Sequence, residues 1–333
     1  MARRRAPIAV SCGCPSGIGV EVAVQAAARM RCGVVLVGDA KQIAETSARL
    51  GVTLPPNVTI DQPGRALASR DRRPGAPTAA GGRAQLAWVD HALDLVTSGR
   101  ARALATGPVN KEVIATSGAT GAETFRGHTE HLQTRLGAPE VVMAFVAKRL
   151  ATSLVTTHLP LAEVPRARSA PAVASAAYWL ATLLRRLRPS DRLRIAVAGL
   201  NPHAGEGGLL GDEETRVIAP GVALAARRAA AAGLGGLSFE GPLGAETAYR
   251  KAASGELAGV VAMYHDQATI PMKLLSFGEA VNVSLGLPVV RTSVDHGTGY
   301  DKAGSGEADA RGMLAALRLA DTLTRESNDF AGR

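Results

Sequence analysis

Short apolar runs alternate with longer amphipathic stretches along this chain, and glycine-rich turns separate them. The first predicted strands and helices cover 7–12, 20–30, 33–39, 85–98 and 101–106. Asp39 is placed to cap a further helix directly after the second strand. Residues 54–83, rich in Pro, Gly and Asp, are expected to be irregular with one short strand. This alternation predicts a doubly wound α/β sheet.

The same alternation continues beyond Thr124, where the segment FRGHTEHLQTRLG reads as a helix start. Two apolar strand runs follow, and Pro189 ends the next long helix. The predicted helices of this part cover 170–188, 212–232, 241–255, 266–276 and 308–325. The predicted strands after His203 cover 260–264, 281–284 and 289–291.

The composition is that of a globular protein with room for two domains. The chain has 333 residues, of which 46% are hydrophobic and 20% charged, and this excludes wholesale disorder. Aromatic residues make up only 3%, so the stacking platforms of a single-strand nucleic-acid binder are missing. The net charge of +9 is spread along the chain and indicates a solvated basic surface rather than a nucleic-acid site, while an anionic substrate would benefit from the same field.

Cysteine usage and hydropathy indicate a cytoplasmic protein. Cys12 and Cys14 form a C-x-C pair, but no second pair completes a zinc knuckle, and Cys32 stands apart. We interpret them as small, partly buried residues in a reducing compartment. No segment approaches the ~20 apolar residues that a membrane span needs, and the N-terminus does not form a signal peptide.

The strongest chemical signal is a set of histidines that each follow an apolar, strand-like run. His158 stands in TTHLP, His203 in NPHAGEGG and His265 in MYHDQ. Strand ends are where an α/β sheet presents side chains to a ligand. Imidazole is a common zinc ligand, and a site with three protein ligands and one open position is catalytic. A single histidine in such a place would more often be an ordinary polar residue.

Two other motifs offer binding chemistry, each with a structural alternative. RGHTEH places Arg126, His128 and Thr129 at a helix start, which suits a phosphate monoester. An ordinary threonine capping box is the alternative. CGCPSGIG is able to cradle a phosphate, or it is only a tight strand-to-helix turn. The residues Lys273, Asn282 and Arg291 follow His265 and are individually uninformative.

Taken in order, several segments closely resemble the 4-hydroxythreonine-4-phosphate dehydrogenase family of vitamin B6 biosynthesis. These segments are TGPVNKEVI, RGHTEH, TTHLPL, GLNPHAGEGGLLGDEE, GPLGAET, YHDQATIPMK and VNVSLGLPVVRTSVDHGTGYDKAGSGEADA. The resemblance implies an isocitrate/isopropylmalate-dehydrogenase-like fold of two α/β domains with a cleft between them. We expect one domain over 1–125 plus 299–333 and a second over 126–298, which carries most metal and substrate residues and the dimer interface. The resemblance also implies an obligate homodimer.

The resemblance further assigns roles to residues of this sequence. His158, His203 and His265 match the ligands of a divalent metal (Zn, Mg or Co), with His265 expected from the partner subunit. The substrate contacts that match are His128, Thr129, Lys273, Asn282 and Arg291. The implied reaction is NAD- or NADP-dependent oxidation of 4-(phosphooxy)-L-threonine at C3, followed by decarboxylation to 3-amino-2-oxopropyl phosphate. Lys273 and Asp266 are candidates for the general base, and the cofactor-binding residues are unknown.

Some positions depart from the family pattern and keep other substrates open. Cys14 and Val20 change the first glycine-rich turn, Glu246 replaces a common Asp, and Lys302 interrupts an apolar position. The alternatives are a related dehydrogenase for D-threonate or D-erythronate 4-phosphate, or one for a cyclic dihydrodiol carboxylate. A non-enzymatic protein that binds phosphorylated metabolites, and a metal-dependent hydrolase, are alternatives of another class.

Overall fold

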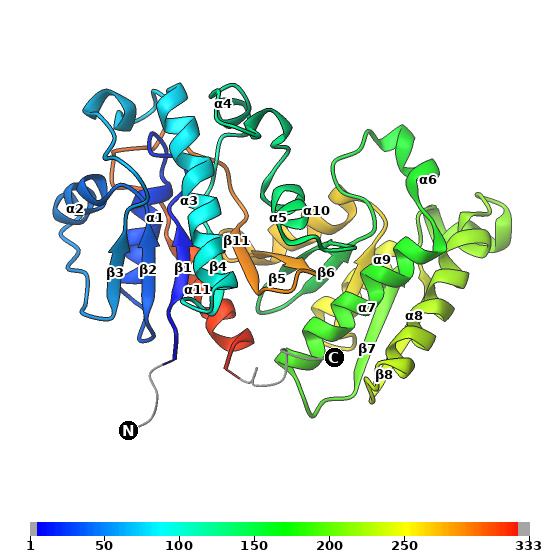
Figure 1. Cartoon of the computed structure of the whole chain (residues 1–333). Helices are drawn as coiled ribbons and strands as arrows, with labels where there is room; N and C mark the ends of the chain where they lie inside the picture. The colour runs from blue at the N-terminus through cyan, green and yellow to red at the C-terminus, as the bar shows by residue number, and fades with distance from the viewer. Residues whose placement is uncertain (1–4, 326–333) are drawn as a thin grey trace. The chain divides into compact units, whose positions relative to one another are not determined.

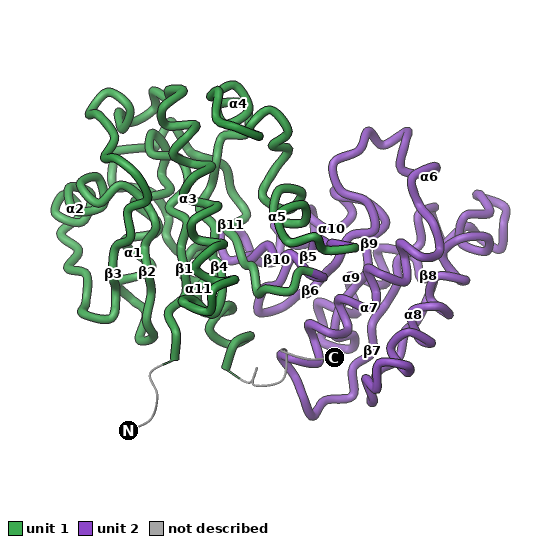
Figure 2. The backbone as a smooth tube through the Cα atoms, in the orientation of Figure 1, with its two compact units in different colours: residues 1–139, 287–333 green, residues 140–286 purple. Residues whose placement is uncertain are grey.

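The computed structural model describes residues 5–325, which form two compact units (Figure 2). Unit 1 contains residues 5–139 and 287–325, and unit 2 contains residues 140–286. Residues 126–139 and 287–298, expected in the second domain, therefore belong to the first. The reason is packing, since Leu132 of the first segment lies in the core of unit 1 and Arg291–Val294 pair with a strand of that unit.

Parallel strands build the sheet of unit 1 in the order β3-β2-β1-β4-β11 (Figure 1). The strands are β1 (Ile8–Ser11), β2 (Val34–Val37), β3 (Val58–Asp61), β4 (Ala103–Thr106) and β11 (Arg291–Val294). The order reverses direction between β1 and β4, as in a doubly wound sheet. Every residue of β1, β2, β4 and β11 is buried, which explains why these strands read as unbroken apolar runs.

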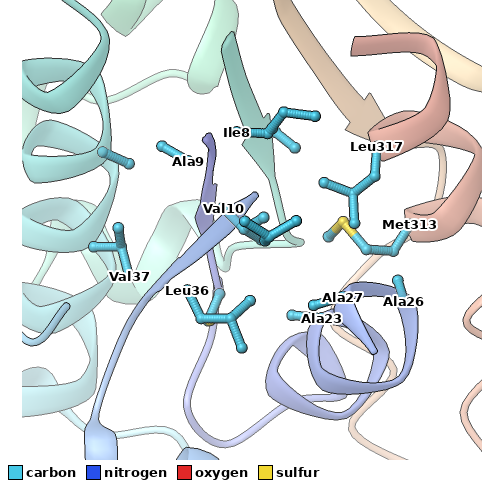
Figure 3. Packing of buried hydrophobic residues seen from close by; sticks show 14 of the residues in the cluster. Ile8, Ala9, Val10, Ala23, Ala26, Ala27, Leu36, Val37, Met313 and Leu317 are labelled. Carbon is cyan, nitrogen blue, oxygen red and sulfur yellow. The ribbon is translucent and has the colours of Figure 1, made fainter. Parts of the chain in front are cut away.

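Helices cover both faces of this sheet. The helices of unit 1 are α1 (Gly19–Ala27), α2 (Ala40–Arg49), α3 (Ala79–Thr97), α4 (Lys111–Ala115), α5 (His128–Leu136) and α11 (Arg311–Leu323). Helix α3 packs on one face, while α1 and α11 pack on the other. Figure 3 shows Val10 and Leu36 directed at α1 and α11, and Ala9 and Val37 directed at the opposite face. Alternate residues of each strand thus enter two separate hydrophobic layers.

Two helix starts in unit 1 are set by side-chain caps. Asp39 accepts a hydrogen bond from the backbone amide of Gln42 at 2.7 Å and caps α2, as predicted. Thr78 caps α3 through the amide of Gly81 at 3.1 Å, so this helix begins at Ala79, earlier than expected. The short strand expected within 54–83 is β3.

The strand order of unit 2 is β10-β5-β6-β9-β7-β8, with antiparallel pairing of β5 to both β10 and β6 and parallel pairing from β6 to β8. The strands are β5 (Val142–Val146), β6 (Ala151–Leu154), β7 (Leu193–Ala198), β8 (Leu237–Leu243), β9 (Gly259–Ala262) and β10 (Val281–Leu285). Strand β8 was not predicted. Its GPL end had been assigned to a helix, whereas α9 begins only at Ala245.

The helices of unit 2 again lie on two sides of the sheet. Helix α7 (Ala170–Leu187) packs against strands β5, β6, β7 and β9, while α9 (Ala245–Ala253) and α10 (His265–Ser276) pack against β6, β7 and β9. Helix α8 (Ala219–Ala231) lies along α7, and a π-helical turn over Glu214–Ile218 precedes it. None of the helices in the described part of the chain is long and apolar enough to cross a membrane.

Candidate metal and substrate site

Three adjacent parallel strands of unit 2 each end shortly before one of the predicted metal ligands. The strands are neighbours in the order β6-β9-β7, and the residues that follow them are His158, His265 and His203. The carboxyl ends of parallel strands lie at one edge of a sheet, which is where α/β proteins bind ligands. The three predicted ligands therefore follow strands that end at one edge of the sheet of unit 2.

His158 and His265 come together within one chain. Their ring centroids are 5.5 Å apart, and the ring planes are inclined by 41°. Two imidazoles on one tetrahedral zinc have Zn–N bonds of about 2.0–2.1 Å, which puts their centroids roughly 5 Å apart. The pair thus has the spacing of two ligands of one ion. The resemblance had implied that His265 comes from the partner subunit, whereas here it lies beside His158 of its own chain.

A carboxylate orients the ring of His265. Nδ1 of His265 lies 2.7 Å from Oδ1 of Asp266. In metal sites the non-ligating ring nitrogen commonly donates to a carboxylate, which fixes the tautomer and leaves the other nitrogen for the metal. This arrangement leaves Nε2 of His265 available to a metal. Asp266, a general-base candidate from the sequence, makes its contact in the structure with this ring.

Buried hydrogen bonds fix the loops that carry the histidines. Thr156, which is 6% exposed, donates from Oγ1 to the carbonyl of Met263 at 2.7 Å. The amide of Met263 donates to Oε1 of Gln267 at 2.6 Å, and Nε2 of Gln267 donates to the carbonyl of Gly199 at 2.9 Å. These bonds connect the ends of β6, β9 and β7 in series. The loop geometry is therefore set by side chains at positions that the sequence analysis did not single out.

His203 lies in an unusual left-handed turn within Pro202–Gly208. Residues 203–207 all have positive φ, including the non-glycine residues His203 (φ 50°), Ala204 (φ 53°) and Glu206 (φ 47°). A left-handed conformation costs roughly 1–2 kcal/mol for each such residue. Within residues 5–325 no three His, Cys, Asp or Glu side chains form a group able to hold a metal ion. One chain thus assembles a pair of the three predicted ligands, and His203 does not complete it.

Replacing Glu206 by glycine should stabilise the protein. Its side chain is exposed and its φ is 47°, so glycine removes the left-handed penalty and raises the free energy of unfolding by about 1 kcal/mol. The control is Glu112→Gly in the right-handed helix α4, where glycine should lower the free energy of unfolding by about 1 kcal/mol. Urea denaturation of both variants measures the difference. If both variants lose the same free energy of unfolding, the turn is not strained.

The predicted anion site lies at the start of α5 in unit 1. Gly127 precedes the helix and makes no side-chain capping bond, so Thr129 sits inside the first turn. The capping-box alternative is therefore wrong. A Cβ atom at position 127 would lie 2.8 Å from Oε2 of Glu130 and 3.4 Å from Cε of Lys111. Glycine at this position lets both side chains close around the helix start.

Positive charge surrounds a neutral imidazole at this helix start. Nε2 of His128 is buried and has no hydrogen-bond partner among the residues described. Burial lowers the pKa of His128 well below its ordinary value, and the charges of Arg291, His131 and Lys111 lower it further. Burial also lowers the pKa of Arg291, to about 10, which leaves it protonated at neutral pH. The arrangement suits an anion, which both cations attract and to which a neutral imidazole can donate one hydrogen bond.

Lys111 is a candidate binding residue that the sequence analysis missed. It opens α4 directly after the turn that follows β4, so its placement obeys the same strand-end rule as the histidines. The available signal was the TGPVNK segment, which was used for the resemblance but not as a source of ligands. Arg291, also from a strand of unit 1, is anchored by a bond from Nη2 to Oγ1 of Thr106 at 2.7 Å.

The remaining predicted substrate residues belong to unit 2. Lys273 is exposed on α10, the helix that His265 opens. Asn282 lies on β10, and its buried Oδ1 has no hydrogen-bond partner within residues 5–325. The predicted substrate residues are thus divided, with His128, Thr129 and Arg291 in unit 1 and Lys273 and Asn282 in unit 2.

The first glycine-rich turn is filled by the protein's own backbone. A Cβ atom on Gly13 would lie 2.4 Å from the carbonyl oxygen of Pro108, and one on Gly17 would lie 2.6 Å from that of Thr298. Cys14 is 1% exposed, and its thiol lies 3.4 Å from the hydroxyl of Tyr300. The glycines are needed for close packing, which favours the tight-turn interpretation of CGCPSGIG over the phosphate cradle.

Comparison with known proteins identifies the family. The sequence profile described as "Pyridoxal phosphate biosynthetic protein PdxA" matches residues 26–320. The chain belongs to the PdxA family. Among relatives named 4-hydroxythreonine-4-phosphate dehydrogenase, the protein of Chromobacterium violaceum is 41% identical over 332 residues, covering 96% of this chain and 97% of its own. The protein of Desulfosudis oleivorans is 39% identical and covers 94% of each chain.

Solved structures of related dehydrogenases share the fold. The 4-hydroxythreonine-4-phosphate dehydrogenase of Klebsiella pneumoniae is 34% identical, with a TM-score of 0.81 over 98% of this chain and 100% of its own. The terephthalate 1,2-cis-dihydrodiol dehydrogenase of Burkholderia xenovorans is 31% identical, with a TM-score of 0.67 over 96% and 98%. These matches confirm the predicted family, the α/β fold of the isocitrate/isopropylmalate-dehydrogenase type and membership in a group of oxidoreductases.

Proposed function

We propose that this chain oxidises 4-(phosphooxy)-L-threonine at C3 with NAD or NADP and releases 3-amino-2-oxopropyl phosphate after decarboxylation. The main observation in support of this proposal is the His158–His265 pair, whose ring centroids are 5.5 Å apart, as fits two ligands of one divalent ion. The charged start of α5 supplies the second requirement, a place for a phosphate. Relatives named for this reaction match the chain almost from end to end.

The residues present fit a divalent metal, with imidazole donors that suit Zn or Co better than Mg. A metal bound there would supply Lewis-acid chemistry, which polarises a hydroxyl or ketone oxygen. In this proposal His158 and His265 hold the ion, and Asp266 keeps the ring of His265 in its ligating orientation. Lys111, Arg291, His128 and Thr129 orient the substrate through its phosphate, Lys273 and Asn282 contact its other polar groups, and the general base stays unassigned.

Related reactions are the closest competitors. The dihydrodiol dehydrogenase gives a lower TM-score, 0.67 against 0.81, than the enzyme of Klebsiella pneumoniae named for the phosphorylated substrate. A substrate without phosphate would also leave two cations, Lys111 and Arg291, beside the single carboxylate of Glu130 at the start of α5. D-Threonate or D-erythronate 4-phosphate satisfies the same phosphate contacts and is the second candidate. The non-enzymatic and hydrolase alternatives are less well supported, because the relatives that match nearly the whole chain are named dehydrogenases.

We further propose a homodimer in which a second copy completes the metal site with His203. Large apolar side chains are exposed in the segments that follow each histidine along the chain, as expected for a surface that a partner covers. They are Leu159, Leu161, Leu209, Leu210, Ile270, Leu274 and Phe277, with exposures between 41% and 83%. We also propose a cytoplasmic location. The substrate is a small anion, none of the described helices could span a membrane, and the three cysteines are free thiols.

A substrate panel with the variants His128→Ala and Thr129→Ala tests the proposed reaction. Reduced nicotinamide should form with 4-(phosphooxy)-L-threonine and much less with its unphosphorylated analogue. Each variant should lose about 1.5–3 kcal/mol of binding for the phosphorylated substrate, since a charge-assisted hydrogen bond is removed. Equal losses on both substrates would mean that these residues do not read phosphate. Product without any nicotinamide absorbance would point to hydrolysis.

A further inference from the structure

Glu214 is a buried carboxylate that accepts hydrogen bonds from the residues just before the turn of His203. It is 4% exposed and opens the π-helical turn that precedes α8. Its Oε1 accepts hydrogen bonds from the backbone amides of Leu200 at 2.7 Å and Asn201 at 2.8 Å. Its Oε2 accepts a third bond from Nδ2 of Asn201 at 3.0 Å. These contacts fall directly before the left-handed residues.

The turn is shaped around this carboxylate. A Cβ atom on Gly199 would lie 3.1 Å from Oε1 of Glu214, and one on Gly205 would lie 2.8 Å from Oε2. Glycines on both sides of His203 therefore allow the backbone to wrap closely around the two oxygens. Non-glycine residues adopt a left-handed backbone only when surrounding contacts hold them there. Glu214 makes such contacts at the beginning of the turn and reaches its middle at Gly205.

A second carboxylate supports the first. Oε2 of Glu213 accepts a hydrogen bond from Nδ2 of Asn201 at 2.7 Å. Oε1 of Glu213 lies 3.9 Å from Nη2 of Arg168, whose side chain is fully buried. The side-chain amide of Asn201 thus donates hydrogen bonds to both carboxylates, and Arg168 places a positive charge near Glu213. On the strand side, Gln267 holds the carbonyl of Gly199 at 2.9 Å.

We propose that Glu214 is a positioning residue that holds His203 in its strained left-handed turn, ready to ligate the metal. The inference rests on the proposed metal site and adds a residue outside the ligand set. Burial alone would raise the pKa of Glu214, but the bonds from Asn201 and Leu200 outweigh it and leave the pKa below its ordinary value. The group is therefore an anion that accepts bonds and never donates one.

The charge of Glu214 is essential to this role, because an amide of the same shape fits less well. In Glu214→Gln one terminal atom becomes an NH₂ group. Placed at the Oε2 position, it would face the NH₂ of Asn201, donor against donor. Placed at the Oε1 position, it would face the amides of Leu200 and Asn201. Either orientation loosens the turn while the volume of the side chain is kept.

The test is a cobalt titration of the full-length protein without substrate or nicotinamide. Co²⁺ binding is followed by its visible absorption and by equilibrium dialysis in wild type, Glu214→Gln, His203→Ala and the double variant. Glu214→Gln should weaken Co²⁺ binding by about tenfold or more, as changes behind metal ligands commonly do. In the His203→Ala background the same change should have no further effect, because the ligand that Glu214 positions is gone.

Glu21→Gln is the matched control. Glu21 is also a buried carboxylate, 3% exposed, and it accepts a hydrogen bond from the backbone amide of Gly304 at 2.6 Å. It lies in unit 1, whereas the proposed metal ligands lie in unit 2. This variant should lower the unfolding temperature without changing Co²⁺ affinity. If Glu214→Gln does not fold, Asn201→Ala removes one of the three bonds to Glu214, together with the bond to Glu213, and should give a smaller weakening of the same kind.

The outcomes separate the inference from the proposed function. If wild type does not bind Co²⁺, or if His203→Ala binds it equally well, the proposed metal site fails. If His203→Ala weakens binding but Glu214→Gln does not, the positioning role fails while the metal site stands. Equal weakening by Glu214→Gln in both backgrounds would show a general structural effect and would also overturn the positioning role.

Discussion

His203→Ala should be nearly inactive as a dehydrogenase while the chain remains folded. Losing one of three ligands sharply lowers metal occupancy, and removing a metal Lewis acid costs several kcal/mol of transition-state stabilisation. Folding should be spared because the side chain of His203 is exposed. Nicotinamide reduction measures the loss, and plasma mass spectrometry of the purified protein measures the metal content.

A control must separate the loss of a ligand from the loss of any histidine. His91 serves this purpose, since it pairs with Asp61 at 2.9 Å on unit 1. His91→Ala should keep its metal and its turnover. If His203→Ala retains wild-type turnover after exhaustive chelation, the metal assignment is wrong. Chelated wild type should lose activity and regain it when Zn²⁺ or Co²⁺ is added.

The edge of the sheet at which the histidines gather was predictable, because it depends on a local rule. Each of His158, His203 and His265 follows a short apolar run, and parallel strands bring such positions to one side. The pairing of His158 with His265 needed the strand order β6-β9-β7, which no local pattern gives. Sequence reasoning therefore found the candidates but assigned His265 to the other subunit.

The left-handed turn around His203 was beyond sequence reasoning for a different reason. Glycines in NPHAGEGG signalled a turn, yet His203, Ala204 and Glu206 are residues that rarely adopt positive φ. Their conformation is imposed by tertiary contacts, above all by Glu214, which is eleven residues further along the chain. Glu214 stands in a run of three acids with Asp212 and Glu213, and nothing in the sequence distinguishes it from these neighbours.

The start of α5 shows how much of a site a local motif can and cannot predict. The motif RGHTEH predicted a helix start and a phosphate site, and the helix does begin at His128. It could not reveal that His128 is buried among cations and therefore neutral. Lys111 opens α4, the helix that follows β4, and Arg291 lies on β11, which neighbours β4 only in the folded sheet.

Mixing two inactive variants should restore activity if the metal site is shared across a dimer. In the proposed arrangement each site takes His158 and His265 from one chain and His203 from the other. When His203→Ala and His265→Ala subunits exchange, a mixed dimer carries one site with both defects and one with neither. Random pairing makes about half the dimers mixed, so roughly a quarter of all sites should be intact.

A second mixture distinguishes which histidine crosses the interface. His158→Ala mixed with His265→Ala should give no recovery, because both ligands of a site come from the same chain and every site in the mixed dimer lacks one. If His265 instead comes from the partner, this second mixture should recover roughly a quarter of the sites as well. Subunit exchange is confirmed by mass spectrometry of a tagged and an untagged chain. Absence of recovery in both mixtures, with exchange confirmed, would place all ligands within one subunit and rule out the shared site.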